Sequence, residues 1–374
     1  MKIRANPIEV GDLIPMPLDV APTAELTDGQ KPLGRPVVLF FFVSAAAEKS
    51  AQGIVAFRDL YAEFVKLNAT VLGVAVANVE KLKAFAQEHN LPFPLLADAQ
   101  LKLSLTYGAA RPERIQEKQA EISIAPRTVL LDSNQRVVKV YDSIDPVTHA
   151  AAVLEDVRQL VNVEPPRAVI QQAPVLLIPN VLPADFCKHL INVWKTEGNE
   201  DSGFMKQVGD KTVGLYNYSH KIRRDHFVKE GPMLVRIKHY VVNRILPEMK
   251  KAYNYEVTRF EDFRIACYDA SRGGYFRPHR DNTTEGTSHR RFAMSLLLNE
   301  EYEGGSLRFP EYGPHTYRPG AGAAVIFSCS LLHEATDVTT GKRFVLLSFF
   351  YGEAERKIRD EYARKQQSQP QKAS

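Results

Sequence analysis

A chain of 374 residues is long enough for two domains, each with its own apolar core. Its formal net charge of +4 is too small to indicate nucleic-acid binding, and no apolar run is long enough for a membrane span or a secretory signal. Three cysteines, Cys187, Cys267 and Cys329, are too few for a disulfide framework. We therefore expect a cytoplasmic protein without nucleic-acid or membrane partners.

The first half of the chain alternates apolar runs of strand length with segments of helical period. The predicted strands are 37–43, 71–76, 95–96, 128–132 and 137–141. The predicted helices are 54–67, 79–89 and 146–161. Strands that alternate with helices and end in a hairpin predict an α/β layered domain over residues 1–162.

Several segments of this half resemble the peroxiredoxins of the thioredoxin fold, namely 37–42, 56–64, 89–98 and 128–132. The resemblance extends over roughly residues 8–161 and aligns the attacking cysteine of that family with Ser50. A serine hydroxyl lacks the thiolate that reduces peroxide, and the second, resolving cysteine falls near Val55. Since no cysteine precedes Cys187, we expect a peroxiredoxin-like thioredoxin-fold domain that is redox-inactive.

Two residues near that lost site are each open to two interpretations. Arg127 corresponds either to the arginine that lowers the pKa of the family's cysteine or to an arginine in a structural salt bridge. Pro126 is a candidate for the cis-proline that many thioredoxin folds carry beside the active site.

A Pro- and Gln-rich stretch, 163–174, has little periodicity and is predicted to link the two halves. Beyond it we expect a strand at 175–178 and a helix at 185–194, followed by a polar, irregular stretch. A long amphipathic helix is predicted at 228–253, and Pro247 should kink or end it.

From residue 263 onward, short apolar runs punctuated by Gly and Pro are typical of an antiparallel sandwich or barrel. This second domain is predicted to span 175–353. The remaining tail, 354–374, is charged and then rich in Gln and Ser, so we expect a helix that frays into disorder.

Residues of metal-ligand type lie within these strands. His279 and Asp281 share one face of a strand or its end, because alternation places residues i and i+2 on the same side. With the later His333 they supply two imidazoles and one carboxylate, the facial ligand set of non-heme Fe(II) oxygenases, which leaves three coordination positions open. Arg343, ten residues past His333, suits a carboxylate better than Lys342, because a planar guanidinium can pair with it through two hydrogen bonds.

A His-x-Asp pair alone is common in solvated turns, but the surrounding segments resemble the prolyl-4-hydroxylase-like 2-oxoglutarate/Fe(II) dioxygenases. The similarity covers roughly residues 175–352. It is carried by Ile-Ala-Cys-Tyr-Asp at 265–269, Gly-Gly-Tyr-Phe-Arg-Pro-His-Arg-Asp at 273–281, Arg-Phe-Ala-Met-Ser-Leu-Leu-Leu-Asn at 291–299 and Gly-Lys-Arg at 341–343. The resemblance implies a double-stranded β-helix, or jelly-roll, in which His279, Asp281 and His333 are the catalytic Fe(II) ligands.

The same resemblance implies that 2-oxoglutarate and O2 are cosubstrates and that ascorbate is a candidate reductant. Arg343 would hold the 5-carboxylate of 2-oxoglutarate, and Tyr268 would lie close to it. Some relatives add a tyrosine from the strand at 295–299, which is absent here, so Ser348 or a water is expected in its place.

The other polar residues of this half are interpreted first as surface residues without a catalytic role. Four histidines without a partner at ligand spacing are expected on the surface, namely His220, His226, His289 and His315. A basic cluster is expected on a solvated face, with contact to an acidic peptide as the alternative; it consists of Arg223, Arg224, His226 and Lys229. The stretch 195–218 is either an exposed loop or a border of the substrate entrance.

The leading hypothesis is a hydroxylase of a side chain, with proline as one candidate, in a protein or peptide that the first domain docks. The alternative is hydroxylation of a free small molecule or amino acid, with the first domain purely structural. Halogenases of this superfamily lack the carboxylate ligand, so Asp281 favours hydroxylation. A non-catalytic binding protein is disfavoured by the complete ligand set, while the substrate and the oligomeric state are not indicated by the sequence.

Overall fold

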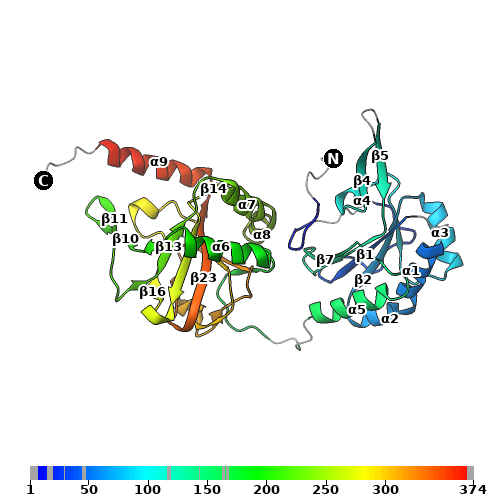
Figure 1. The fold of residues 1–374 in the computed structure, drawn as a ribbon, viewed down its shortest axis with the longest axis horizontal. Helices are drawn as coiled ribbons and strands as arrows, with labels where there is room; N and C mark the ends of the chain where they lie inside the picture. Colours follow the sequence, from blue (N-terminus) through cyan, green and yellow to red (C-terminus); the bar gives the residue numbers. More distant parts are fainter. Residues whose placement is uncertain are drawn as a thin grey trace. The chain divides into compact units, whose positions relative to one another are not determined.

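The computed structural model describes residues 7–14, 20–28, 30–43, 48–115, 119–142, 144–161, 165 and 168–368. The chain divides into two compact units, Met1–Pro166 and Arg167–Ser374 (Figure 1). Among the described helices, none has both the length and the apolar character that a membrane crossing requires.

The first unit is built on a five-stranded sheet with β1 at its centre (Figure 1). From edge to edge the strands are β3 (Leu95–Ala97), β2 (Thr70–Ala75), β1 (Val37–Phe42), β6 (Arg127–Leu131) and β7 (Val137–Tyr141). β1, β2 and β3 are parallel, whereas β6 and β7 continue the sheet antiparallel. Every residue of β1, β2 and β6 is buried, as expected of apolar runs in a sheet that is covered on both faces.

Helices and a hairpin complete the first unit, and the predicted α/β layering is confirmed. These elements are α1 (Glu48–Asp59), α2 (Tyr61–Lys66), α3 (Val79–Glu88), α4 (Lys102–Thr106), β4 (Ala110–Ile115), β5 (Gln119–Ile124) and α5 (His149–Leu160). Phe40 and Phe57 belong to the core on one face of the sheet, and Phe41 and Tyr107 to the core on the other. The single helix expected at 54–67 is divided into α1 and α2 at Leu60, and the β4–β5 hairpin was not predicted.

The second unit is built around two antiparallel sheets, the jelly-roll that we expected (Figure 1). The larger sheet contains β8 (Leu176–Ile178), β21 (Ala324–Ser328), β17 (Phe292–Leu297), β23 (Val338–Tyr351), β15 (Arg264–Asp269), β13 (Arg224–Phe227) and β9 (Glu200–Asp201), with β14 (Arg259–Phe260) and β18 (Tyr302–Gly304) also paired to β23. The smaller sheet contains β12 (Lys221–Ile222), β16 (Tyr275–His279), β22 (His333–Ala335), β19 (Leu307–Arg308) and β20 (Thr316–Tyr317).

Alternation along β15 and β23 gives the larger sheet two different faces. Ile265 and Leu346 pack in the main core of this unit against the helix α6 (Ala184–Thr196) and the helices that follow it. Ala266, Tyr268 and Val345 point to the opposite side and form a separate, smaller cluster. One face therefore supports the fold, and the other is left for the interior of the barrel.

The helix expected at 228–253 has three parts. α7 (Pro232–Tyr240) continues into a π-helical turn, Val241–Ile245, and then into α8 (Leu246–Tyr253). Pro247 lies in the first turn of α8, where its missing N–H removes no hydrogen bond that the helix needs. The proline therefore marks a new helical start after a local widening.

The helix that we expected at the start of the tail is α9 (Glu353–Ser368), and it extends through the Gln-rich residues up to Ser368. Tertiary contacts hold this helix in place. Glu355 pairs with Arg291 at 3.0 Å, and Lys365 pairs with Glu285 at 3.0 Å. The Tyr362 hydroxyl also accepts a 3.0 Å hydrogen bond from the backbone N–H of Thr212. Thr212 lies in the hairpin of β10 (Phe204–Val208) and β11 (Lys211–Leu215), within the stretch that we expected to be irregular.

Candidate metal centre

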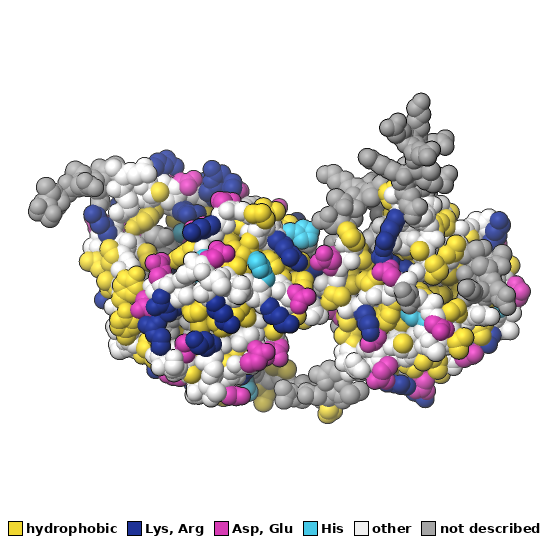
Figure 2. All heavy atoms as spheres, in the orientation of Figure 1, with side chains coloured by type: hydrophobic (Ala, Val, Ile, Leu, Met, Phe, Trp, Pro, Cys, Tyr) yellow, Lys and Arg dark blue, Asp and Glu magenta, His cyan; other side chains and the backbone are white. Residues whose placement is uncertain are grey.

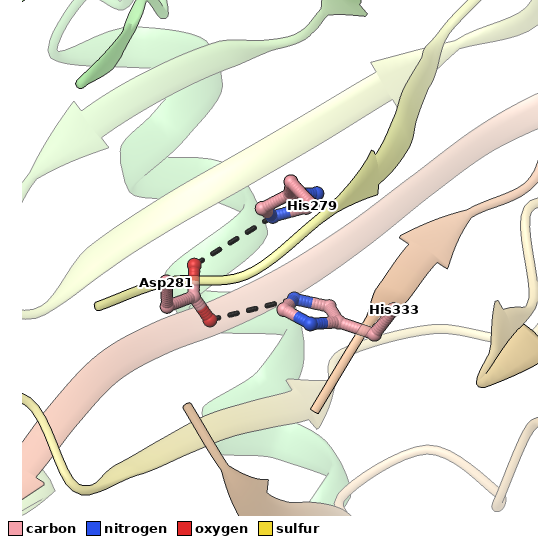
Figure 3. Close-up of side chains that lie close together, drawn as sticks. All are labelled: His279, Asp281 and His333. Carbon is pink, nitrogen blue, oxygen red and sulfur yellow. Dashed lines mark ion pairs between the residues drawn. The ribbon is translucent and has the colours of Figure 1, made fainter. Parts of the chain in front are cut away.

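The structure brings His279, Asp281 and His333 together at one point of the smaller sheet (Figure 3). His279 ends β16 and His333 begins β22, and the two are directly paired across these strands. The Asp281 backbone N–H donates to the Cys329 carbonyl at 3.0 Å, which holds the carboxylate beside the two imidazoles. The donor atoms of the three residues all lie within 4.8 Å of one another, and this is the one such group within the described residues.

Both imidazoles are oriented by the backbone. His279 Nδ1 lies 2.8 Å from the Arg277 carbonyl, and His333 Nδ1 lies 2.9 Å from the Leu331 carbonyl. A carbonyl oxygen only accepts, so each Nδ1 carries the proton and each Nε2 keeps its lone pair. Those Nε2 atoms face Asp281, at 3.6 Å from Oδ1 for His279 and 3.4 Å from Oδ2 for His333 (Figure 3). Metal-binding histidines commonly donate the N–H of their other ring nitrogen to a carbonyl in this way.

The electrostatics of the group favour the protonation states that a metal requires. Burial lowers the pKa of His333 to about 4, despite the opposing charge of Asp281. Burial acts in the other direction on Asp281, but the neighbouring imidazoles of His333 and His279 lower the pKa of its carboxyl below the usual range. A neutral imidazole and an ionised carboxylate are the forms that bind metals near neutral pH.

A cavity of about 860 Å³ lies between the two sheets and is lined by these three residues and by Arg343. Arg343 on β23 is buried, and its Cα partner on β15 is Tyr268. Its Nη2 donates weakly to the Ser295 hydroxyl at 3.3 Å, while Nε has no hydrogen-bond partner among the described residues. Lys342 points the other way and pairs with Asp269 at 2.8 Å, half exposed.

The other two predicted cosubstrate contacts also line the cavity. The Tyr268 hydroxyl accepts a 3.3 Å hydrogen bond from Arg223 Nη1, and the Arg343 guanidinium lies 5.0 Å from the centre of the Tyr268 ring. The Ser348 hydroxyl donates to the Glu261 carbonyl at 2.7 Å, so its proton is already engaged. Ser295, which reaches Arg343 directly, was not singled out, although alternation from the neighbouring strand pairings places it on the inner face.

Several expectations of surface exposure are wrong. His226 and His289 are buried, His220 lines the cavity, and only His315 of the four predicted surface histidines is exposed. Arg223 is also buried and pairs with Asp225 through two hydrogen bonds of 2.7 and 2.6 Å. The sequence could have indicated this pair. Asp225 carries the opposite charge two residues after Arg223, and in an extended segment such residues lie on the same face.

In the first unit, Arg127 has the structural role. It is buried, donates to Asp142 at 2.7 Å through Nε, and donates to the Tyr107 carbonyl at 2.9 Å. None of the described peptide bonds is cis, so Pro126 does not have the cis geometry that we considered. Ser50 lies in α1, and its side chain is outside the described part of the structure.

Comparison with known families matches each half of the chain separately. The AhpC/TSA family matches residues 19–140, and the 2OG-Fe(II) oxygenase superfamily matches residues 263–351. The second match contains all three residues of the cluster and Arg343.

Individual relatives divide in the same way. Peroxiredoxin Bcp of Bacillus subtilis is 28% identical over 156 residues, which are 41% of this chain and 97% of the relative. A procollagen lysyl hydroxylase and glycosyltransferase of Acanthamoeba polyphaga mimivirus is 30% identical over 190 residues, which are 47% of this chain but 19% of the viral protein. A solved Pseudomonas putida prolyl-4-hydroxylase has 20% identity and a TM-score of 0.38, covering 48% of this chain and 94% of that one. The chain thus joins an AhpC/TSA peroxiredoxin-like domain to a 2OG-Fe(II) oxygenase domain, and it is a 2-oxoglutarate- and Fe(II)-dependent dioxygenase.

Proposed function

We propose that His279, Asp281 and His333 hold the iron and that the enzyme hydroxylates a side chain of a protein or peptide. The observation that carries this proposal is the convergence of three metal-type donors within 4.8 Å in a cavity that also contains the Arg343 guanidinium. The donor set fits Fe(II), because two imidazoles and one carboxylate leave positions for cosubstrate and O2.

Arg343 fits the far carboxylate of 2-oxoglutarate. Its guanidinium is buried, and Nε lacks a partner among the described residues, so a bidentate carboxylate would satisfy a donor that the protein leaves unpaired. Tyr268 is proposed as a wall of the same subsite, since its ring faces Arg343. Ser348 is better placed as a support for the Glu261 backbone than as a cosubstrate donor.

Bound iron would activate O2 and couple the oxidation of 2-oxoglutarate to succinate and CO2 with hydroxylation of the substrate, and ascorbate is the proposed reductant. The protein's own contribution is geometry. The Arg277 and Leu331 carbonyls fix the two imidazoles, and the rings of Phe276 and Phe327 pack on them, with centroids 3.4 Å from His279 and 4.6 Å from His333. These apolar rings limit the access of water to the ligand set.

A side chain of a protein as substrate is supported by the viral relative, whose name describes a procollagen lysyl hydroxylase. We propose that the peroxiredoxin-like domain docks this substrate, since no cysteine is available there for thiol chemistry. The buried, unpaired state of Cys187, Cys267 and Cys329 supports a cytoplasmic location.

The test is a titration of the purified full chain, stripped of metal with a chelator, with Fe(II) under anaerobic conditions. We expect one Fe(II) per chain and, after oxygen is admitted, slow formation of succinate from 2-oxoglutarate. Addition of lysate proteins should then yield peptides heavier by one oxygen, detected by mass spectrometry. Absence of both iron binding and succinate would contradict the proposed function.

A further inference from the structure

A second buried guanidinium lines the same cavity, and it has even fewer partners than Arg343. The Arg264 side chain on β15 is 17% exposed. Its Nε is buried without a hydrogen-bond partner, and the structure shows no hydrogen bond from its guanidinium to any described residue. The nearest carboxylate oxygen, Glu261 Oε2, is 3.9 Å from Nη2, beyond hydrogen-bonding distance.

Glu261 forms a long ion pair but no hydrogen bond with Arg264, because other residues already occupy its oxygens. Arg290 donates to both of them, at 2.6 Å from Nε and 2.8 Å from Nη2, and His289 lies 2.9 Å from Oε1. Burial raises the pKa of Glu261, but the His289 hydrogen bond and the Arg290 charge outweigh it and lower this pKa to about 2. The Glu261 carboxylate therefore lies beside the guanidiniums of Arg290 and Arg264 and forms hydrogen bonds with Arg290 but not with Arg264.

The other charged residues around Arg264 also have partners of their own. Asp225, the other carboxylate that acts on it, is bound by Arg223. The buried Lys221 donates to Ser202 and to the Gly203 carbonyl, which are neutral. The aromatic rings of Phe227 and Phe349 flank the Arg264 guanidinium at 5.3 and 5.6 Å. A buried guanidinium that makes no hydrogen bond is costly, so an anion that accepts from it would complete this site.

Arg264 is distinct from the proposed cosubstrate clamp. On β15 it precedes Tyr268, the Cα partner of Arg343, by four residues and points to the same face. At a rise of roughly 3.3 Å per residue, the two arginine positions are about 13 Å apart along the sheet. The cavity of about 860 Å³ lies near the upper end of the volumes that hold drug-sized ligands, so it has room for a small diacid and a second group.

Phe349 and Arg290 connect Arg264 to Asp281, one of the proposed metal ligands. The Arg290 guanidinium stacks on the Phe349 ring at 3.8 Å, the ring that also faces Arg264. Arg290 Nη1 in turn donates to the Asp281 carbonyl at 3.3 Å. Phe227, on the other side of Arg264, is 44% exposed, so this end of the cavity meets solvent. On the face shown in Figure 2, the surface of the second unit carries many Lys and Arg side chains.

We propose that Arg264 binds a carboxylate of the hydroxylated substrate, so that the enzyme selects substrates with an acidic group close to the reacting position. The Arg264 guanidinium is planar and lies between two aromatic rings, so its N–H groups can donate two parallel hydrogen bonds to a carboxylate. The acid is either an Asp or Glu side chain of a peptide or the carboxylate of a free acid. The inference rests on the proposed function, because it assumes that substrate and cosubstrate share the cavity.

The test is competitive binding of paired peptide pools to the full chain, loaded anaerobically with Fe(II) and saturating 2-oxoglutarate. One pool contains Glu or Asp at degenerate positions, and its twin contains Gln or Asn there. We expect the acidic pool to bind about 10- to 100-fold better, the range of a charge-assisted hydrogen bond. Arg264→Gln should abolish the preference, and Arg264→Lys should retain part of it. Arg259→Gln is the matched control, since that exposed arginine pairs with Glu353 outside the cavity.

Free L-glutamate and L-glutamine, added as competitors, distinguish the two sources of the carboxylate. Competition by glutamate alone, lost in Arg264→Gln, assigns the site to a free acid; no competition assigns it to an acidic peptide. The proposal is overturned if the wild type shows no acid preference or if the preference survives Arg264→Gln. It is also overturned if Arg264→Gln weakens 2-oxoglutarate binding as strongly as Arg343→Gln does. Melting temperatures verify that each variant folds, and Fe(II) binding by the wild type tests the proposed function separately.

Discussion

Each unit buries an arginine that the sequence analysis singled out, and the two arginines differ in their partners. Arg127 in the first unit is 4% exposed and is bound by Asp142 and by the Tyr107 carbonyl. Arg343 in the second unit is 2% exposed, yet it has one long hydrogen bond to Ser295 and an unpartnered Nε. The Arg127 guanidinium is part of the structure of its unit. Where a ligand is expected, the protein leaves hydrogen-bonding capacity open.

The largest effect is expected at the ligand set. His279→Ala or Asp281→Ala should abolish Fe(II) binding and succinate formation, because loss of a second-shell partner alone costs about 10–100-fold and loss of a ligand costs more. Iron titration and succinate assays of the full chain measure both. His315→Ala, at an exposed histidine of the same unit, is the control. Undiminished turnover in either ligand variant would refute the assignment.

A somewhat smaller effect is expected at Arg343. Arg343→Ala should weaken 2-oxoglutarate binding about 30- to several-thousand-fold, since loss of one partner of a buried charge pair costs roughly 2–5 kcal/mol. The affinity of Arg343→Lys for 2-oxoglutarate should be intermediate, because lysine keeps the positive charge but cannot donate two parallel hydrogen bonds from a planar group. Affinities measured with Fe(II)-loaded protein check this.

Two controls sharpen the comparison between the units. Lys342→Ala should leave 2-oxoglutarate binding intact, because Lys342 pairs with Asp269 outside the cavity. Arg127→Ala should also leave it intact and change only the stability of the first unit. If Lys342→Ala were the damaging change, the roles of the two neighbouring residues would be reversed.

The first unit should show its own pH dependence. Burial lowers the pKa of His149 to about 4, while in the unfolded chain it is near 6.5. The unfolded state therefore takes up this proton first, so stability falls as the pH drops from about 6.5 to about 4, by up to roughly 3 kcal/mol. Denaturant unfolding of the full chain between pH 7 and 4 measures the loss. His149→Gln should remove this contribution, and an unchanged pH profile in that variant would rule it out.

The smallest effect is expected on uncoupled turnover after deletion of residues 1–162. The ligand set, Arg343 and the cavity all belong to the second unit, so succinate formation without substrate should stay close to that of the full chain. Hydroxylation of a macromolecular substrate should fall, because docking raises its effective concentration. Loss of both activities in a soluble, cooperatively melting truncation would indicate that the first unit only stabilises the second. Unchanged hydroxylation would refute the docking role.

Local sequence predicted the elements well where apolar periodicity was strong. β1 and β2 coincide closely with the runs at 37–43 and 71–76, since a buried strand needs only apolar side chains in sequence. The local sequence was least informative where polar segments are ordered by contacts with residues far away in the chain. The β10–β11 hairpin is held by Tyr362 and could not be inferred from its own composition. A helix was expected where α9 lies, but the contacts of Arg291 and Glu285 that hold it against the second unit were not.

The sequence by itself determined the chemistry available to this protein: the spacing of His279, Asp281, His333 and Arg343, and the absence of cysteine from the first half. Tertiary structure decided which cations remain open to ligands. Arg127 meets Asp142, and Arg290 meets Glu261 across 29 residues, whereas Arg264 and Arg343 each keep a buried, unpartnered Nε. All four residues are arginines, and the residue type alone does not separate them. The difference arises because the carboxylate that pairs with an arginine often comes from a distant segment, and only folding decides which carboxylate lies beside it.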